Sequence, residues 1–105
     1  MDYTYNIPLD ITDRYQPLIN IVIKNFKPFR YSVTLFILDG DCISNVMTWE
    51  NYHATDHMDL FFKDKPAQKR EKSKFGKIKS INEIIKLCNY IDKNHSKLIS
   101  QYFKG

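Results

Sequence analysis

A long amphipathic helix is encoded at the C-terminal end of the chain. Ser80-Ile81-Asn82-Glu83 fits a capping box, in which two side chains bind the first backbone amides of a helix. Apolar residues then recur at helical spacing, which predicts a helix over residues 81–103. This apolar stripe contains Ile81, Ile84, Ile85, Cys88, Ile91, Leu98, Ile99 and Tyr102. A helix with one apolar face has to bury that face against another layer of structure.

The middle of the chain predicts that second layer as a β-hairpin followed by a further strand. Residues 30–38 alternate in a β-rich run, and Tyr31, Val33, Leu35 and Ile37 share one face. Asp39-Gly40-Asp41 is typical of a tight turn between two strands. The returning strand spans residues 42–49, with Ile43, Met47 and Trp49 on one face, and residues 58–62 suggest a third strand.

The N-terminal part predicts an extended arm and a first helix. Residues 1–9 contain Pro8 and form the arm, which can pair with its own sheet edge or add a strand to a partner's sheet. Asp10 or Thr12 can cap a helix that ends before Lys27-Pro28. Its inner face would carry Ile19, Val22, Ile23 and Phe26. The predicted fold is therefore α+β: a small antiparallel sheet of three or four strands with an N-terminal and a C-terminal helix packed on it.

Composition restricts the class of protein. A chain of 105 residues, 43% hydrophobic and 27% charged, is expected to form a single globular domain over residues 1–105. No apolar run is long enough to span a bilayer, and the N-terminus has no secretory signal, so we expect a cytoplasmic protein without membrane contact. Cys42 and Cys88 each lie in an apolar pattern and are expected to be buried, reduced thiols. No glycine-rich phosphate loop, dinucleotide fingerprint or nucleophile elbow is present, and no cofactor is predicted.

Positive charge is concentrated in residues 63–79, which we call the basic segment. It has eight basic and two acidic residues, a net charge of +6 in a chain whose total is +4. This clustering favours a polyanionic partner such as RNA, although a solvated basic loop that only maintains solubility fits equally well. The predicted nucleic-acid-binding residues are Lys63, Lys65, Lys69, Arg70, Lys72 and Lys74, with Tyr52 as a stacking platform.

The groups best suited to catalysis lie in residues 49–59. His53 and His57 are four positions apart, and Glu50 lies nearby. A histidine pair can act as general base and general acid in RNA cleavage, with Glu50 as the orienting carboxylate and the basic segment stabilising the phosphate. The same histidines with Asp59 would also suit Zn²⁺ or Mn²⁺, but the spacing is not diagnostic and no metal site is predicted. A third interpretation makes both histidines surface residues without a chemical role.

Two neighbouring candidates have simpler interpretations. His95 lies on the apolar stripe of the C-terminal helix, which favours a partly buried histidine with its hydrogen bonds satisfied. Trp49 ends a predicted strand and is expected to anchor the core.

The motif Trp49-Glu50-Asn51-Tyr52-His53 resembles the corresponding stretch of TumE-type small toxins, with glutamate where that family more often has aspartate. The order of predicted elements also resembles that family over roughly residues 10 to 95. The resemblance implies the toxin of a toxin–antitoxin pair, neutralised by an antitoxin encoded next to it.

Three hypotheses follow. The first is a toxin-like protein that binds RNA and cleaves it through His53, His57 and Glu50. The second is a non-catalytic binding module whose basic segment holds a nucleic acid or an acidic protein. The third is an interaction subunit that pairs with itself, through the arm of residues 1–9, or with an antitoxin.

Overall fold

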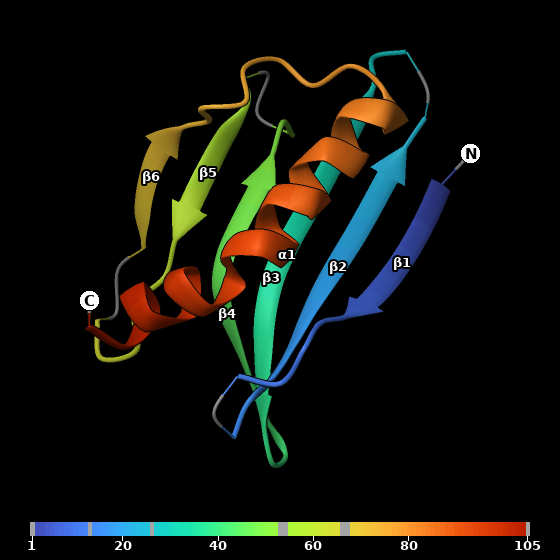
Figure 1. The fold of residues 1–105 in the computed structure, drawn as a ribbon. Helices are drawn as coiled ribbons and strands as arrows, with labels where there is room; N and C mark the ends of the chain where they lie inside the picture. The colour runs from blue at the N-terminus through green and yellow to red at the C-terminus, as the bar shows by residue number, and fades with distance from the viewer. Residues whose placement is uncertain (1, 13, 26, 53–54, 66–67, 105) are drawn as a thin grey trace.

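A single antiparallel sheet forms most of the molecule. The computed structural model describes residues 2–12, 14–25, 27–52, 55–65 and 68–104, which form six strands and one helix (Figure 1). The strands are β1 (Asp2–Pro8), β2 (Gln16–Lys24), β3 (Arg30–Asp39), β4 (Cys42–Glu50), β5 (His57–Leu60) and β6 (Lys69–Lys72). Each strand pairs with the next one along the chain, so the sheet is a meander in sequence order. Gly40, with a φ of 64°, occupies the predicted turn between β3 and β4.

The prediction of an N-terminal helix is wrong, because residues 16–24 form β2. Ile19, Ile21 and Ile23 are buried, and the residues between them are partly exposed, which is the two-residue period of a strand. β2 pairs along its whole length with β1 and β3, and its isoleucine and valine side chains suit such a position. The predicted sheet of three or four strands with an N-terminal and a C-terminal helix packed on it is therefore replaced by six strands and a single helix among the described residues.

The segments predicted as an arm and a loop both contribute strands. Residues 2–8 of the arm form β1, which pairs with the chain's own β2. Within the basic segment, residues 69–72 form β6, which pairs with β5 at the other edge of the sheet. The rings of Tyr3 and Tyr5 stack with their centroids 6.3 Å apart on β1.

A β-bulge changes the predicted face of the start of β4. Leu35 pairs with Met47 but Phe36 pairs with Asn45, so Val46 is an extra residue on β4. Val46 and Met47 are consequently both buried, although they are neighbours in sequence. The shift moves Ile43 off the face that Met47 and Trp49 occupy, and Ile43 is 67% exposed, which corrects its predicted place with them.

The helix α1 (Ile81–Lys104) covers one face of the sheet (Figure 1). Its predicted capping serine and glutamate are confirmed: Ser80 Oγ accepts from the Glu83 backbone amide at 3.4 Å, and Glu83 Oε1 accepts from the Lys79 amide at 3.2 Å. The helix buries Ile84, Leu87, Ile91, His95, Leu98, Ile99 and Tyr102. Ile81 and Ile85, predicted in the apolar stripe, are exposed. No helix among the described residues is long and apolar enough to cross a membrane.

The two faces of the sheet differ in chemistry because strand residues alternate. The face under α1 carries the core, including Ile19, Val33, Leu35 and Trp49, none more than 1% exposed. The opposite face, fixed by the strand register, carries mostly polar residues on the middle and later strands. These residues are Asn20, Ser32, Thr34, Thr48, Glu50, His57, Asp59 and Arg70.

The two cysteines differ in exposure, which corrects the expectation that both are buried. Cys42 is exposed at the start of β4, while Cys88 is half-buried on α1, where burial raises the pKa of its thiol to about 11. Since the thiolate is the reactive form, a thiol reagent at pH 8 is expected to modify Cys42 at least about tenfold faster than Cys88. Mass spectrometry of the partly modified native protein measures this ratio. Equal rates at both positions would contradict the described packing of α1.

Candidate functional site

Three ionisable side chains meet on the polar face of the sheet, on β4 and β5. Glu50 and His57 are directly opposite each other in the register of these strands, and Asp59 is opposite Thr48 two pairs further along. Since alternate residues of a strand share a face, His57 and Asp59 project on the same side as Glu50. We call Glu50, His57 and Asp59 the carboxylate–histidine cluster.

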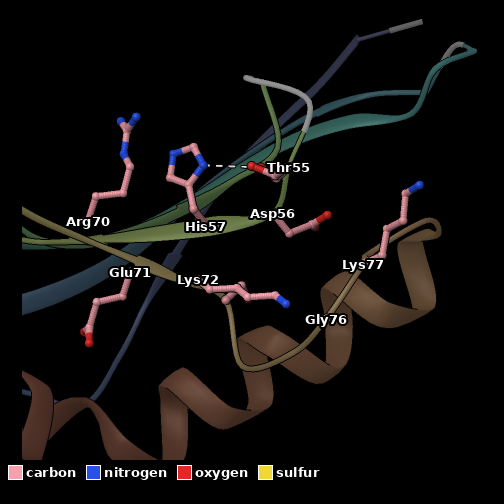
Figure 2. A pocket seen from close by; sticks show the side chains of 9 residues that line it. Thr55, Asp56, His57, Arg70, Glu71, Lys72, Gly76 and Lys77 are labelled. Carbon is pink, nitrogen blue, oxygen red and sulfur yellow. Dashed lines mark hydrogen bonds between the residues drawn. The ribbon is translucent and has the colours of Figure 1, made fainter.

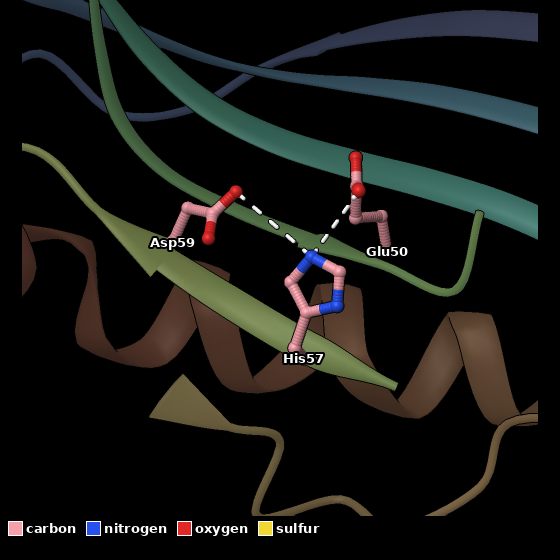
Figure 3. A group of neighbouring side chains, drawn as sticks. All are labelled: Glu50, His57 and Asp59. Carbon is pink, nitrogen blue, oxygen red and sulfur yellow. Dashed lines mark ion pairs between the residues drawn. The ribbon is translucent and has the colours of Figure 1, made fainter. Parts of the chain in front are cut away.

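The imidazole of His57 lies between the two carboxylates (Figure 3). His57 Nε2 is 3.2 Å from Glu50 Oε1 and 4.0 Å from Asp59 Oδ2. His57 and Asp59 are each only 5% exposed, so water screens electrostatic interactions within the cluster only weakly. The three side chains therefore form one compact group of ionisable residues on the polar face of the sheet.

Two further contacts orient the cluster from outside. His57 Nδ1 lies 3.2 Å from the Thr55 carbonyl oxygen, and since a carbonyl can only accept, Nδ1 carries the proton of this hydrogen bond. Arg70 on β6 donates from Nε to Asp59 Oδ1 at 2.9 Å and from Nη2 to Oδ2 at 3.3 Å. The ring nitrogen that faces the carboxylates is therefore fixed as Nε2, and the Asp59 carboxylate is held by a two-bond contact.

A pocket of about 820 Å³ lies beside the cluster, at the end of the sheet where β5 begins and β6 ends (Figure 2). His57 and Arg70 line it from one side of the sheet, and Glu71 points to the other side. Its ionisable lining residues are Asp56, His57, Arg70, Glu71, Lys72 and Lys77. Three of these residues, Arg70, Lys72 and Lys77, are the cationic groups that an anionic ligand in the pocket needs.

Asp56 fixes the loop that forms one wall of this pocket. Its Oδ2 accepts from the Tyr31 hydroxyl at 2.6 Å and from the Ile78 backbone amide at 3.0 Å. These bonds join β3, the loop before β5 and the segment that leads into α1. Burial, and then the hydrogen bond to Asp56, raise the pKa of Tyr31 well above its ordinary value of 10.0.

Tyr31→Phe is expected to lower the free energy of unfolding by about 1.5–3 kcal/mol at pH 8, because it removes a hydrogen bond to a carboxylate. The difference between wild type and variant should shrink above pH 10, where Tyr31 ionises in the unfolded chain but stays protonated in the folded one. Urea unfolding at pH 8 and pH 11 measures both effects. A difference that grows at pH 11 would contradict the assigned role of this hydroxyl.

The five residues of the Trp49–His53 motif have separate roles. Trp49 is fully buried, which confirms its predicted role as a core anchor, and Glu50 belongs to the cluster. Asn51 joins the end of β4 to β3: its Oδ1 accepts from the Tyr31 amide and its Nδ2 donates to the Phe29 carbonyl, both at 2.9 Å. The Tyr52 ring lies 5.7 Å from Lys24 Nζ, a cation–π contact. His53, the predicted catalytic partner of His57, lies outside the described residues.

The predicted phosphate-binding residues of the basic segment do not form one surface. Arg70 and Lys72 line the pocket together with Lys77, which was not among them. Lys63 and Lys65 lie beyond the other end of β5, where their ammonium groups contact the rings of Phe103 and Phe62. Lys74 donates to the Tyr90 hydroxyl of α1 at 2.9 Å, and Lys69 is exposed on β6, opposite Leu60 in the register.

His95 is confirmed as a buried histidine with hydrogen-bond partners. Its Nδ1 is 2.7 Å from the Asp92 carbonyl oxygen and its Nε2 is 3.1 Å from the Asp10 carbonyl oxygen. It joins α1 to the segment after β1 and lies on the helix side of the sheet.

The sequence interpretation assigned no role in the catalytic group to Asp59. The alternation of His57 and Asp59 in a short strand is the signal that places both on one face, but only the pairing of β5 with β4 brings them to Glu50. Comparisons with protein-family models, with curated proteins and with solved structures found no match for this chain.

Proposed function

We propose that this chain is a toxin-like cytoplasmic protein that binds RNA at the pocket and cleaves it at the carboxylate–histidine cluster. The observation that carries the proposal is the position of the His57 imidazole, held between two carboxylates in the wall of a pocket with three cationic side chains. Phosphodiester cleavage needs groups that move protons and cations that stabilise the phosphate, and both are present here within one site.

The cluster can act in cleavage by one of two routes. In the first, His57 and His53 act as the acid–base pair and Glu50 orients His57, which are the roles predicted from the sequence. In the second, the cluster holds a cation that polarises the phosphate. The location of the chemistry is the same in both routes.

A fluorescent single-stranded RNA tests the proposal. Binding is measured by fluorescence anisotropy over a series of salt concentrations, and cleavage by gel electrophoresis of the same samples. We expect affinity to fall steeply with salt, because binding to phosphates releases counterions, and we expect shortened products to accumulate. An RNA that neither binds nor is shortened would contradict the proposal.

The toxin part of the proposal is supported by the Trp49–His53 resemblance and has its own test. Induced expression in a bacterial host is expected to arrest growth, and co-expression of a protein encoded beside the gene, with a DNA-binding helix-turn-helix pattern, is expected to restore it. Normal growth at high expression of folded protein would remove the toxin assignment and leave the RNA proposal standing.

A non-catalytic binding module is the second candidate, and the burial of His57 favours it. The imidazole is 5% exposed, and both ring nitrogens face protein oxygens. In this case the pocket binds RNA or an acidic protein without changing it. Tight, salt-sensitive binding of an RNA that stays intact would favour this candidate over cleavage.

A further inference from the structure

The geometry points to a divalent-cation site formed by Glu50, His57 and Asp59, for which we propose Zn²⁺ or Mn²⁺ as the class of ligand. The inference deepens the proposed function, because it assigns cleavage to a cation-dependent route. The binding of the cation itself depends only on the three side chains, so it can be measured without RNA.

The distances bring the three side chains close to the arrangement of ligands around one metal ion. The ligand atoms of the cluster all lie within 4.8 Å of one another, and His57 Nε2 is 3.2 Å from Glu50 Oε1. Ligand atoms bound at about 2.1 Å from a metal lie roughly 3.0–3.4 Å apart when they are adjacent in the coordination sphere. The 4.0 Å from Nε2 to Asp59 Oδ2 is longer than this and needs a small rotation of the Asp59 carboxylate.

The correct atom of each ligand faces the centre. Because His57 Nδ1 donates to the Thr55 carbonyl, Nε2 is the nitrogen left to coordinate, and it points between the two carboxylates (Figure 3). A histidine that binds metal through one nitrogen usually donates from the other to a carbonyl or carboxylate. The outer contact of a metal-binding histidine is therefore already in place.

Arg70 makes the outer contact of the ligand Asp59, as the Thr55 carbonyl does for His57. Its shorter bond, 2.9 Å from Nε, is to Oδ1, while Oδ2 is the oxygen nearest His57. The guanidinium can keep Oδ1 and orient the carboxylate while Oδ2 coordinates, which is the usual arrangement around carboxylate ligands. With the neutral imidazole that metal ligation requires, two carboxylates and one guanidinium give a net charge of −1, which attracts a cation.

The chemistry of the donors selects the class of ion. One imidazole and two carboxylates suit Zn²⁺ and Mn²⁺, whereas Ca²⁺ prefers oxygen ligands only. Three protein ligands leave positions for water or a phosphate oxygen, and a cation so bound acts as a Lewis acid. With the ion bound, Nε2 is a ligand, so cation binding and proton transfer at this atom exclude each other.

Paramagnetic broadening by Mn²⁺ tests the site in the wild-type protein. In a nitrogen-15 correlation spectrum, substoichiometric Mn²⁺ is expected to broaden the amide signals of Glu50, His57 and Asp59 first. Broadening that instead begins at exposed carboxylates elsewhere, or no selective broadening, would overturn the inference. This measurement needs no substitution and no RNA.

Calorimetry with matched variants gives the second readout. Glu50→Gln and Asp59→Asn are each expected to weaken Zn²⁺ binding at least about tenfold. Asp41→Asn makes the same chemical change in the exposed β3–β4 turn and is expected to leave the affinity unchanged. Unchanged affinity in both cluster variants, with melting temperatures showing that they fold, would overturn the inference.

The two proposals fail separately. If RNA is cleaved equally in the presence of a chelator and no Zn²⁺ or Mn²⁺ binds, the cation inference fails and the proposed function stands on proton transfer. If the ions bind at the cluster but RNA neither binds nor is cleaved, the cation site stands and the proposed function fails.

Discussion

Replacing His57 by alanine is expected to lower the rate of RNA cleavage by about 100-fold or more, while RNA affinity changes by less than about threefold. His57 is the central group of the cluster in both routes, as proton carrier or as metal ligand, and loss of such a group costs about 10²–10⁴ in rate. The phosphate-binding cations of the pocket remain in place. Single-turnover cleavage of a saturating, labelled RNA measures the rate separately from binding.

Two further variants distinguish a loss of catalysis from a loss of folded structure. His57→Gln keeps a polar side chain that can donate toward Glu50, and it is expected to be as inactive as His57→Ala with a higher melting temperature. His95→Ala removes the other buried histidine, whose contacts tie α1 to residue 10, so it should lower stability but not the cleavage rate of the folded protein. Full activity of folded His57→Ala would remove cleavage from the cluster.

Charge reversal of Lys72 and Lys77 is expected to weaken RNA binding by about thirtyfold and to lower the slope of log affinity against log salt by about 2. Both lysines are exposed and line the pocket. Lys72 is opposite His57 in the strand register, but no ion pair or side-chain hydrogen bond joins either lysine to the described side chains of the cluster. Arg70 is left unchanged, because its loss would leave the buried Asp59 without its cation. Anisotropy of a short RNA over several salt concentrations gives both numbers.

Lys63→Glu with Lys65→Glu is the matched control. It changes the net charge of the same basic segment by the same amount, but these lysines lie beyond the other end of β5, near Phe62 and Phe103. We expect a loss of affinity of less than about threefold, from the long-range change in charge. Equal losses in the two double variants would show that RNA responds to total charge and not to the pocket.

The local signals of the sequence located several elements correctly. The Asp39-Gly40-Asp41 turn, the alternation of residues 30–38 and the Ser80–Glu83 cap each depend on neighbouring residues, and the structure has β3, β4 and α1 at these places. Residues 16–24 contain both a helical spacing of apolar residues and an isoleucine at every second position, Ile19, Ile21 and Ile23. Pairing with two neighbouring strands decides in favour of the strand, and no local pattern contains that information.

The candidate site shows the same difference between what local sequence signals predict and what strand pairing decides. Their titratable groups made it possible to predict that residues 49–59 contain candidate site residues, and the concentration of cations downstream was predictable too. The partner of His57 was not, because the partners depend on register: β4 brings Glu50, and β6 brings Arg70 to Asp59. The division of the basic lysines between the pocket and the far end of β5 also follows from the formation of β6, which the charged sequence of residues 69–72 did not indicate.

The most direct test of the central claim locates the bound RNA on the protein. A 2′-O-methyl RNA lacks the attacking hydroxyl and stays intact, so the complex can be titrated to saturation in a nitrogen-15 correlation spectrum. We predict that the amide signals of Glu50, His57, Asp59 and Lys72 shift with the bound fraction, while those of Lys86, Lys93 and Lys97 on the exposed face of α1 do not. Shifts confined to α1, or absent from the cluster at saturation, would contradict the account.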